Sequence, residues 1–450
     1  MDTENQVTEN RLGTMGVGKL LVVMSVPTMF SMLIQALYNI VDSIFVSHYS
    51  EMALTAVSLA FPLQMLTFAF AVGTGVGICS VISRRLGERR EEEADRAAES
   101  GYAIQLLFML MFVLIGAFLA KPFVKLYTSD TALVDMTTSY LRICLMLSLG
   151  TFVNIFCEKT LQATGDTIHP MIIQASGAIF NVIFDPVLIF GYLGFPAMGV
   201  KGAAIATVAG QLFAMALGLF FLKRNRYIHI RLLRPVLRKA EAKEIMTVGV
   251  PSIIMQGIGT VMTSLMNAIL IVHHVLATTV FGVYFKLQSF VFLPIFGLNS
   301  GLMPILGYNY GARNKERMMK ALKLALVFAF LFMTFGTLVF SFFPDVLLGL
   351  FNASDELKTI GEVALRLISW SFPLAAISIT VGTLFQAMGD GVYSMIISIV
   401  RQLGILIPIA WLFGKLFGLD AIWYSFMVAE VFSLALSLFF FRKELRKLDF

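Results

Sequence analysis

The segment Asn181–Pro186 places polar groups inside a long apolar stretch that can cross a bilayer. Asn181 and Asp185 are four residues apart, so both side chains project from one face of a helix. Pro186 has no N–H, which leaves the carbonyl of Val182 without its helical partner. A carboxylate, an amide and a freed carbonyl are ligands suited to a proton or a small hard cation. The alternative is structural: a kinked helix whose acid pairs with a neighbouring helix.

A second acid, Asp42, also lies within an apolar stretch. Gln35, Tyr38 and Asp42 share one helix face, because they are spaced by three and four residues. Asp42 and Asp185 lie about 22 and about 15 residues from the cytoplasmic starts of their spans, which at ~1.5 Å per residue places both in the outer half of the bilayer. Thr207 reaches a similar depth. Two carboxylates close together in a low dielectric repel each other, which suits protonation during transport.

The composition predicts an all-α integral membrane protein. Of the 450 residues, 58% are hydrophobic and 14% are charged, and the mean hydropathy is +0.83. A soluble globular protein carries about 25% charged residues. The net charge of +6 does not indicate nucleic acid, because the basic residues lie mostly in loops. The sequence contains neither a nucleotide-binding loop, nor a nucleophile–base constellation, nor a cysteine spacing typical of a metal site, so we expect no enzymatic activity and no ATP-driven step.

Hydropathy predicts twelve transmembrane helices with both termini in the cytoplasm. Alternate loops are basic: the segments on one side carry 23 Lys and Arg residues, and the loops on the other side carry three. The positive-inside rule therefore predicts a multi-pass protein of the inner (plasma) membrane with its basic side in the cytoplasm. The predicted spans are residues 20–46, 54–83, 101–120, 136–160, 170–192, 199–222, 244–270, 278–306, 321–343, 359–384, 392–416 and 421–441.

The chain repeats itself at an offset of 224 residues. Gln162–Asp166 matches Gln386–Asp390, and Gly87 matches Gly311. One register holds over about 140 residues without a gap, so chance is a poor explanation. Each repeat contains six spans, an even number, and both halves therefore enter the membrane from the same side.

This repeat predicts two six-helix lobes related by a pseudo-two-fold axis along the membrane normal. The lobes comprise residues 1–222 and 244–450, and a basic cytoplasmic linker, residues 223–243, joins them. Two such lobes facing a midplane cavity are typical of an alternating-access transporter. A channel built on the same repeat is the alternative.

The second half lacks the intramembrane acids of the first and contains bases instead. Lys286 and Arg401 lie within predicted spans, and Glu430 in the last span is positioned to neutralise either. A structural ion pair and a substrate-lining role both remain open. We place Lys286 and Arg401, together with Gln35 and Tyr38, among the candidates for the substrate cavity.

The sequence resembles the multidrug and toxic compound extrusion (MATE) transporters over nearly its whole length, in particular their MepA-like bacterial branch. The resemblance rests on six motifs that are specific only together: Tyr38–Asp42, Gln162–Asp166, Asn181–Pro186, Gly199–Thr207, Pro294–Gly301 and Gly307–Gly311. It implies efflux of cationic or amphipathic drugs by antiport with H⁺ or Na⁺. It also implies that Asp42, Asn181 and Asp185 bind the coupling ion, with Thr207 as a further ligand.

The expected partners are small-molecule drugs, organic cations and membrane lipid, and not nucleic acid, with the protein acting as a monomer. We expect neither a cofactor nor a metal ion other than Na⁺ at Asp42, Asn181 and Asp185. The alternative function is a lipid-linked oligosaccharide flippase of the same wider superfamily. A flippase cavity should be basic to hold a pyrophosphate, whereas the candidates here are two bases against two acids.

Overall fold

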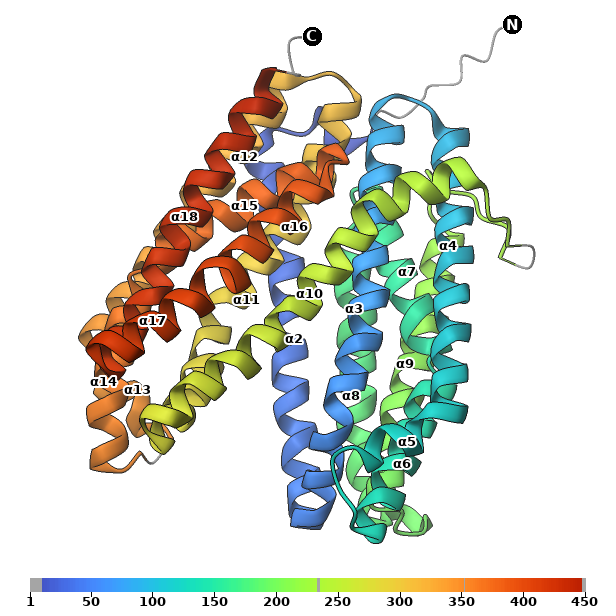
Figure 1. Cartoon of the computed structure of the whole chain (residues 1–450). Helices are drawn as coiled ribbons and strands as arrows, with labels where there is room; N and C mark the ends of the chain where they lie inside the picture. The colour runs from blue at the N-terminus through green and yellow to red at the C-terminus, as the bar shows by residue number, and fades with distance from the viewer. Residues whose placement is uncertain (1–9, 233–234, 352, 447–450) are drawn as a thin grey trace, which may run out of the picture.

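The structure is a computed structural model that describes residues 10–232, 235–351 and 353–446. All regular elements of the described residues are helical. Residues 233–234 of the predicted linker, and residues 1–9 and 447–450 of the predicted terminal segments, lie outside the described residues. The polypeptide forms two groups of helices that stand side by side (Figure 1).

The N-lobe contains the helices that precede the linker. They are α1 (Arg11–Thr14), α2 (Val17–Tyr49), α3 (Glu51–Gly87), α4 (Glu91–Leu114), η1 (Ile115–Leu119), α5 (Ala120–Lys125), α6 (Thr131–Met146), α7 (Leu149–Ala163), α8 (Ile168–Phe190), η2 (Tyr192–Gly194) and α9 (Val200–Lys223). The C-lobe contains α10 (Lys239–His273), α11 (Val275–Gly311), α12 (Lys315–Phe342), α13 (Pro344–Gly349), α14 (Asp355–Ser369), α15 (Phe372–Met388), α16 (Gly391–Ile399), η3 (Val400–Leu406), α17 (Ile407–Phe417) and α18 (Leu419–Leu445).

The twelve predicted spans are confirmed, although two of them are bent pairs of helices. Ten helical segments of the described residues are long and apolar enough to cross a bilayer, and two bent pairs bring the number to twelve. The predicted spans 136–160 and 359–384 are each broken, with bends of 44° between α6 and α7 and 47° between α14 and α15. Pro373 lies in the first turn of α15, where its missing N–H is tolerated, and this favours a new helix start there.

The repeat extends to the limits of the helices and to their caps. Adding 224 to the limits of α3 gives the limits of α11. Ser50 alone separates α2 from α3, and its hydroxyl accepts a hydrogen bond from the Ala53 N–H at 3.0 Å. Its repeat partner His274 separates α10 from α11 and accepts from the Leu276 N–H through Nδ1 at 3.2 Å. Both residues therefore cap the helix that follows them.

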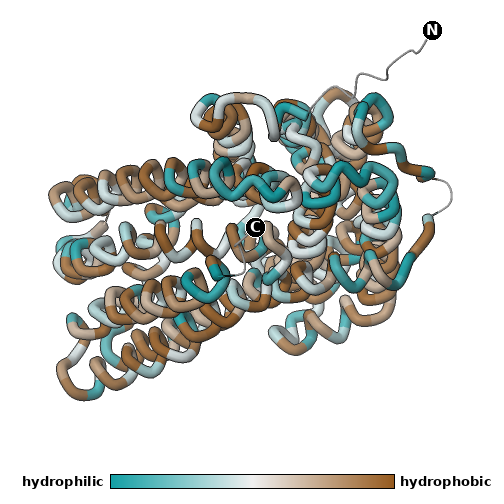
Figure 2. Tube along the Cα trace, turned by 90° about the horizontal axis from the view of Figure 1, so that it is seen from above, coloured by the Kyte–Doolittle hydropathy of each residue, from teal (hydrophilic) through white to brown (hydrophobic). Residues whose placement is uncertain are grey.

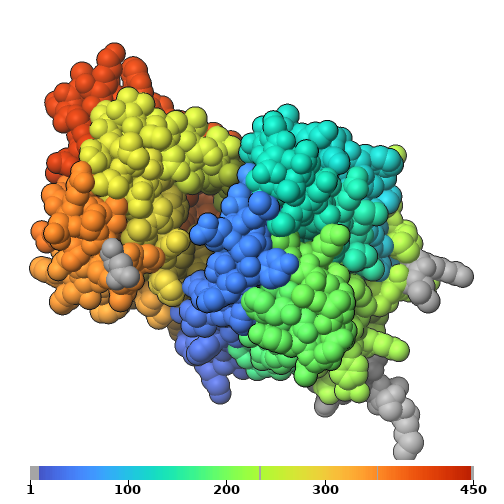
Figure 3. Space-filling model, turned by 90° about the horizontal axis from the view of Figure 1, so that it is seen from below, coloured from blue at the N-terminus to red at the C-terminus, as the bar shows by residue number. Residues whose placement is uncertain are grey.

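The two lobes meet at one end of the molecule and separate towards the other. They approach at the end where α2 begins and α18 finishes, and diverge towards the ends of α10 and α2 (Figure 1). In the view onto the first end, hydrophilic residues gather near the helix termini, whereas hydrophobic residues follow the helices (Figure 2). From the opposite side, the surface is hollowed between α10 and α2 (Figure 3).

Close helix crossings hold the lobes together. α10 packs along α3, and α11 packs along α2. A Cβ added at Gly73 would lie 2.5 Å from Ile253, and one added at its repeat partner Gly297 would lie 2.5 Å from Met29. Since Met29 and Ile253 are themselves repeat partners, the interface follows the same two-fold relation as the lobes. Small residues allow such backbone approach within a membrane.

Single cysteines should reveal the orientation of the two ends. We expect a cysteine replacing Arg89, Arg231 or Arg313 to react with an impermeant maleimide only from the cytoplasm, because the positive-inside rule predicts that the basic loops lie there. A cysteine replacing Lys358, at the other end of the C-lobe, should react only from outside. The background should lack Cys79, Cys144 and Cys157, and labelling of position 231 from outside would contradict the two-lobe topology.

Candidate functional site

Three helices of the N-lobe bring the predicted ion ligands together. α2 carries Asp42, α8 carries Asn181 and Asp185, and α9 carries Thr207. The carboxyl groups of Asp42 and Asp185 lie close enough to hydrogen-bond when one of them is protonated. The sequence predicted the face shared by Asn181 and Asp185, and the packing of α2 and α9 against α8 completes the cluster.

The amide of Asn181 connects Asp185, on the same helix, to Thr207 on α9. In the orientation that satisfies both neighbours, its nitrogen donates to Asp185 Oδ2 at 2.5 Å. Its oxygen then accepts from the Thr207 backbone N–H at 3.0 Å and lies 3.3 Å from the Thr207 hydroxyl. This orientation is assigned from the hydrogen-bond partners. Asn181 therefore fixes the position of the Asp185 carboxylate relative to α9.

Tyr38 and Gln35, two of the predicted site residues on α2, have different neighbours. Tyr38 contacts the Thr207 hydroxyl with its own and lies near both carboxylates. Gln35, one turn nearer the end where the lobes meet, accepts a hydrogen bond from Gln174 of α8 at 2.8 Å. Tyr38 is thus part of the acid cluster, whereas Gln35 binds α2 to α8 beside it.

Sequence reasoning missed a group of residues near Asp42. Tyr140 and Cys144, one turn apart on α6, both lie near Asp42. Gln64 of α3 donates to the Tyr140 hydroxyl at 3.2 Å and to Cys144 Sγ at 3.7 Å. The available signal was Gln64 itself, a polar residue within an apolar stretch, but its partners lie on another helix.

The acid cluster carries negative charge without a basic partner. Among the described residues, no Lys, Arg or His forms an ion pair with Asp42 or Asp185. Asp185 is fully buried, and Asp42 Oδ1 is buried without a hydrogen-bond partner. Uncompensated buried carboxylates are costly, so the site favours binding of a proton or a cation. The described residues contain no cluster of three or more His, Cys, Asp or Glu side chains arranged for a metal ion.

The two bases predicted in the C-lobe have different environments. Arg401 donates from Nη1 to Glu430 Oε1 at 3.3 Å, and both residues line a cavity of about 420 Å³ within the C-lobe. Lys286 lies outside that set of lining residues: it is exposed, with its ammonium 5.9 Å from the centre of the Phe351 ring. The structure thus places Arg401, but not Lys286, in the wall of this cavity.

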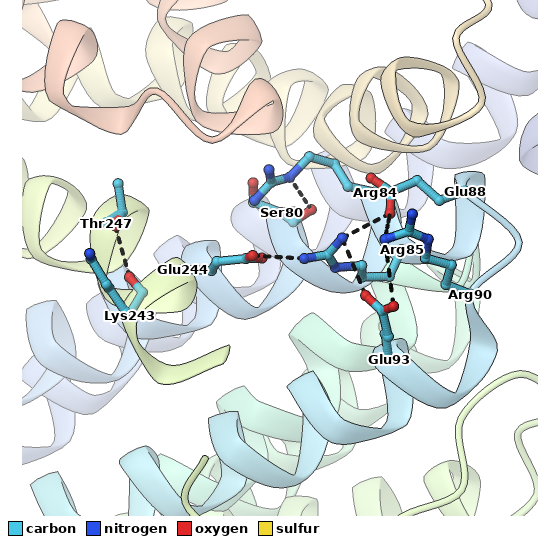
Figure 4. Close-up of polar contacts among 9 residues, drawn as sticks. All are labelled: Ser80, Arg84, Arg85, Glu88, Arg90, Glu93, Lys243, Glu244 and Thr247. Carbon is cyan, nitrogen blue, oxygen red and sulfur yellow. Dashed lines mark hydrogen bonds and ion pairs between the residues drawn. The ribbon is translucent and has the colours of Figure 1, made fainter. Parts of the chain in front are cut away.

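A polar network crosses between the lobes at the end where they meet. Arg85 of α3 contacts Glu244 of α10 at 2.7 Å and also pairs with Glu88 at 2.8 Å and Glu93 at 3.3 Å (Figure 4). Ser80 of α3 donates to the backbone carbonyl of Gln386 at 2.6 Å. These contacts close one end of the molecule, and any opening of that end must break them.

Two repeated helical lobes, closed at one end and enclosing an acidic site within the spans, define a membrane transporter. The chain belongs to the MatE family, whose two matches cover residues 27–187 and 248–412. Each match covers most of one lobe, in agreement with the internal repeat.

Two relatives and one solved structure are similar to this chain over nearly its whole length. The chain is 24% identical to the "FAD transporter" of Shewanella oneidensis, with 90% of each chain covered. It is 26% identical to the "Multidrug export protein MepA" of Staphylococcus haemolyticus, with 92% of this chain and 91% of the relative covered. A structure described as the outward-facing conformation of a multidrug resistance MATE family transporter of the MOP superfamily superposes with a TM-score of 0.91, at 25% identity and 99% coverage of both chains.

Proposed function

We propose that this protein is a secondary active multidrug efflux transporter that exports cationic or amphipathic compounds by antiport with H⁺ or Na⁺. The observation that carries the proposal is the pair of carboxylates, Asp42 and Asp185, without a basic partner among the described residues. A proton, Na⁺ or an organic cation is the natural partner of such a site. The likeness to a multidrug export protein supports the same substrate class.

The acid pair also supplies a mechanism for exchange. When both carboxylates are charged they repel in a poorly screened site, which holds α2 and α8 apart. Binding of a proton or Na⁺ relieves the repulsion and lets the helices approach. We infer that this approach narrows the N-lobe site and releases the drug on the side where the lobes diverge. Drug and ion then need only favour different shapes of one lobe.

The alternative functions require an anionic substrate. A flippase for lipid-linked oligosaccharides must hold a pyrophosphate. The Shewanella relative is named an FAD transporter, and a protein that exports FAD must also hold a pyrophosphate. Here the acid cluster is negative, Arg401 is paired with Glu430, and Lys286 lies outside the C-lobe cavity. These charges favour the export of cations.

Efflux from proteoliposomes tests the proposal. Vesicles containing the purified protein and ethidium should lose the dye when a pH gradient or a Na⁺ gradient is imposed separately, and the effective gradient identifies the coupling ion. Loss of dye at the same rate from protein-free vesicles, or no loss under either gradient, would refute the antiport.

Competition between ion and drug should appear in equilibrium binding. We expect ethidium affinity in detergent to change across about pH 5 to 9 or on addition of Na⁺, because a bound ion cancels the charge that attracts the cation. Linkage requires the drug to weaken ion binding by the same factor. Asp185→Asn should flatten this response even where ethidium still binds, since the variant cannot exchange a proton. An affinity that is independent of both pH and Na⁺ in the wild type would exclude the coupling.

A further inference from the structure

The C-lobe cavity is separate from the acid cluster of the N-lobe and has a different character. Its walls come from α10, α11, α15, η3 and α18, all in the C-lobe, and its volume is about 420 Å³. This volume lies in the range of small-molecule sites, which combine apolar walls with a few convergent polar groups. Aromatic walls are provided by Phe285, Phe292, Phe296 and Phe426, with amides from Gln256, Gln288 and Gln402.

The charged pair in the wall is incompletely satisfied. A guanidinium has five N–H donors, yet among the described residues only the 3.3 Å bond from Nη1 to Glu430 Oε1 reaches Arg401. Glu430 Oε2 is buried without a hydrogen-bond partner. The side chains of Arg401 and Glu430 are 21% and 12% exposed, so both are reachable from the cavity but largely desolvated. The guanidinium thus has unused donors at the cavity wall, and the carboxylate has one oxygen that is not hydrogen-bonded.

Arg401 lies in a helical segment whose geometry differs from that of its repeat partner. Arg401 and Gln402 lie in the π-helical segment η3, and both line the cavity. The repeat partner of this segment, residues 176–182 of α8, is α-helical. The wider turn is therefore specific to the C-lobe, and π-helical turns are frequent at functional sites.

Charge balance selects the ligand. A simple cation that took Glu430 away from Arg401 would leave a desolvated guanidinium unpaired, and a simple anion would leave the carboxylate unpaired; either result is costly. A zwitterion brings a negative group for Arg401 and a positive group for Glu430, so each residue keeps a partner and the cavity stays neutral. Its carboxylate binds the guanidinium, its ammonium takes the place of the guanidinium at the Glu430 carboxylate, and an aromatic body packs against the phenylalanines.

We propose that the C-lobe cavity is a second binding site, selective for aromatic zwitterions that insert between Arg401 and Glu430. This site is independent of the proposed cation antiport, since it uses no residue of the acid cluster. It would bind net-neutral amphoteric compounds, whereas the N-lobe binds cations.

Four compounds that share an indole ring separate the charge requirements. They are tryptophan (zwitterion), tryptophan amide and tryptamine (cations), and indole-3-propionate (anion), each radiolabelled and measured by equilibrium dialysis against the purified full-length protein in detergent. We expect tryptophan to bind at least about tenfold more tightly than the other three, because only it satisfies both charges. Equal affinities for the four compounds, stronger binding of one of the ions, or no binding of tryptophan would overturn the proposal.

Variants locate the binding within the cavity. Arg401→Gln and Glu430→Gln should each weaken tryptophan binding by about tenfold or more, as expected when one partner of a desolvated ion pair is removed. The double exchange Arg401→Glu, Glu430→Arg retains both charges and should restore part of the affinity and of the protein yield. Lys286→Gln removes a cation outside the cavity and should leave binding unchanged.

Asp42→Asn separates this site from the antiport. It should retain tryptophan affinity whether or not efflux survives, because Asp42 lies in the other lobe. Tryptophan affinity that is lost in Asp42→Asn but retained in Arg401→Gln and Glu430→Gln would place the site in the N-lobe and refute the proposal.

Discussion

Replacing Asp42 with asparagine should abolish ethidium efflux while the protein still inserts and folds. Asparagine keeps the size of the side chain and some hydrogen bonding, but it can neither exchange a proton nor neutralise a cation. The Asp42 carboxyl faces that of Asp185, so its loss removes the charge repulsion that we propose opens the site. We expect the efflux rate in proteoliposomes to fall by at least about a hundredfold, because catalytic proton carriers contribute about 10²–10⁴-fold where they act.

The matched control is Asp135→Asn. Asp135 is an acid of the same lobe whose side chain is 70% exposed and pairs with Lys121 at 3.1 Å. A surface pair of this kind contributes little to stability, and efflux by this variant should equal that of the wild type. Wild-type efflux by Asp42→Asn at equal protein content would remove Asp42 from the mechanism.

Adding one methyl group where the lobes touch should shift the balance between conformations. A Cβ at Gly87 would lie 2.0 Å from the Tyr308 carbonyl oxygen, and a Cβ at its repeat partner Gly311 would lie 2.1 Å from the Arg84 carbonyl oxygen. Tyr308 and Arg84 are also repeat partners, so α3 and α11 cross at a two-fold contact. Backbone atoms cannot yield as side chains do, and we expect Gly87→Ala and Gly311→Ala to disfavour the closed end.

The expected size of the effect follows from overpacking. Forcing extra atoms into a close contact costs about 1–3 kcal/mol, which corresponds to roughly a 5- to 150-fold change in the ratio of two states. Arg96 and Lys320 are exposed repeat partners near this end. With spin labels at these two positions, double electron–electron resonance should therefore report a longer distance between the labels in both variants.

A glycine on the same helix provides the control. A Cβ at Gly282 of α11 would have nothing within 4 Å, so Gly282→Ala should leave the distance distribution unchanged. If Gly87→Ala and Gly311→Ala also leave it unchanged, the contact does not determine which end is closed.

The sequence by itself determined the features that depend on local composition and spacing. Hydropathy located the twelve spans because lipid requires each crossing segment to be apolar and helical. The 224-residue repeat predicted two lobes, and the limits of α3 and α11 agree with it residue by residue. The spacing of Asn181 and Asp185 placed both on one face of α8, because helical periodicity is a property of the backbone alone.

Only the tertiary structure decided which faces of different helices meet. Asp42 and Asp185 lie 143 positions apart, and their contact depends on how α2 and α8 rotate and pack. The same applies to Gln64 and Tyr140, which no local pattern connects, and to Arg401 and Lys286, of which only the first lines the C-lobe cavity. Hydropathy specifies that a segment lies in the membrane but not how the helix is rotated about its own axis. This rotation is fixed by side-chain packing among all the helices together, and the same packing also sets the bends between α6 and α7 and between α14 and α15.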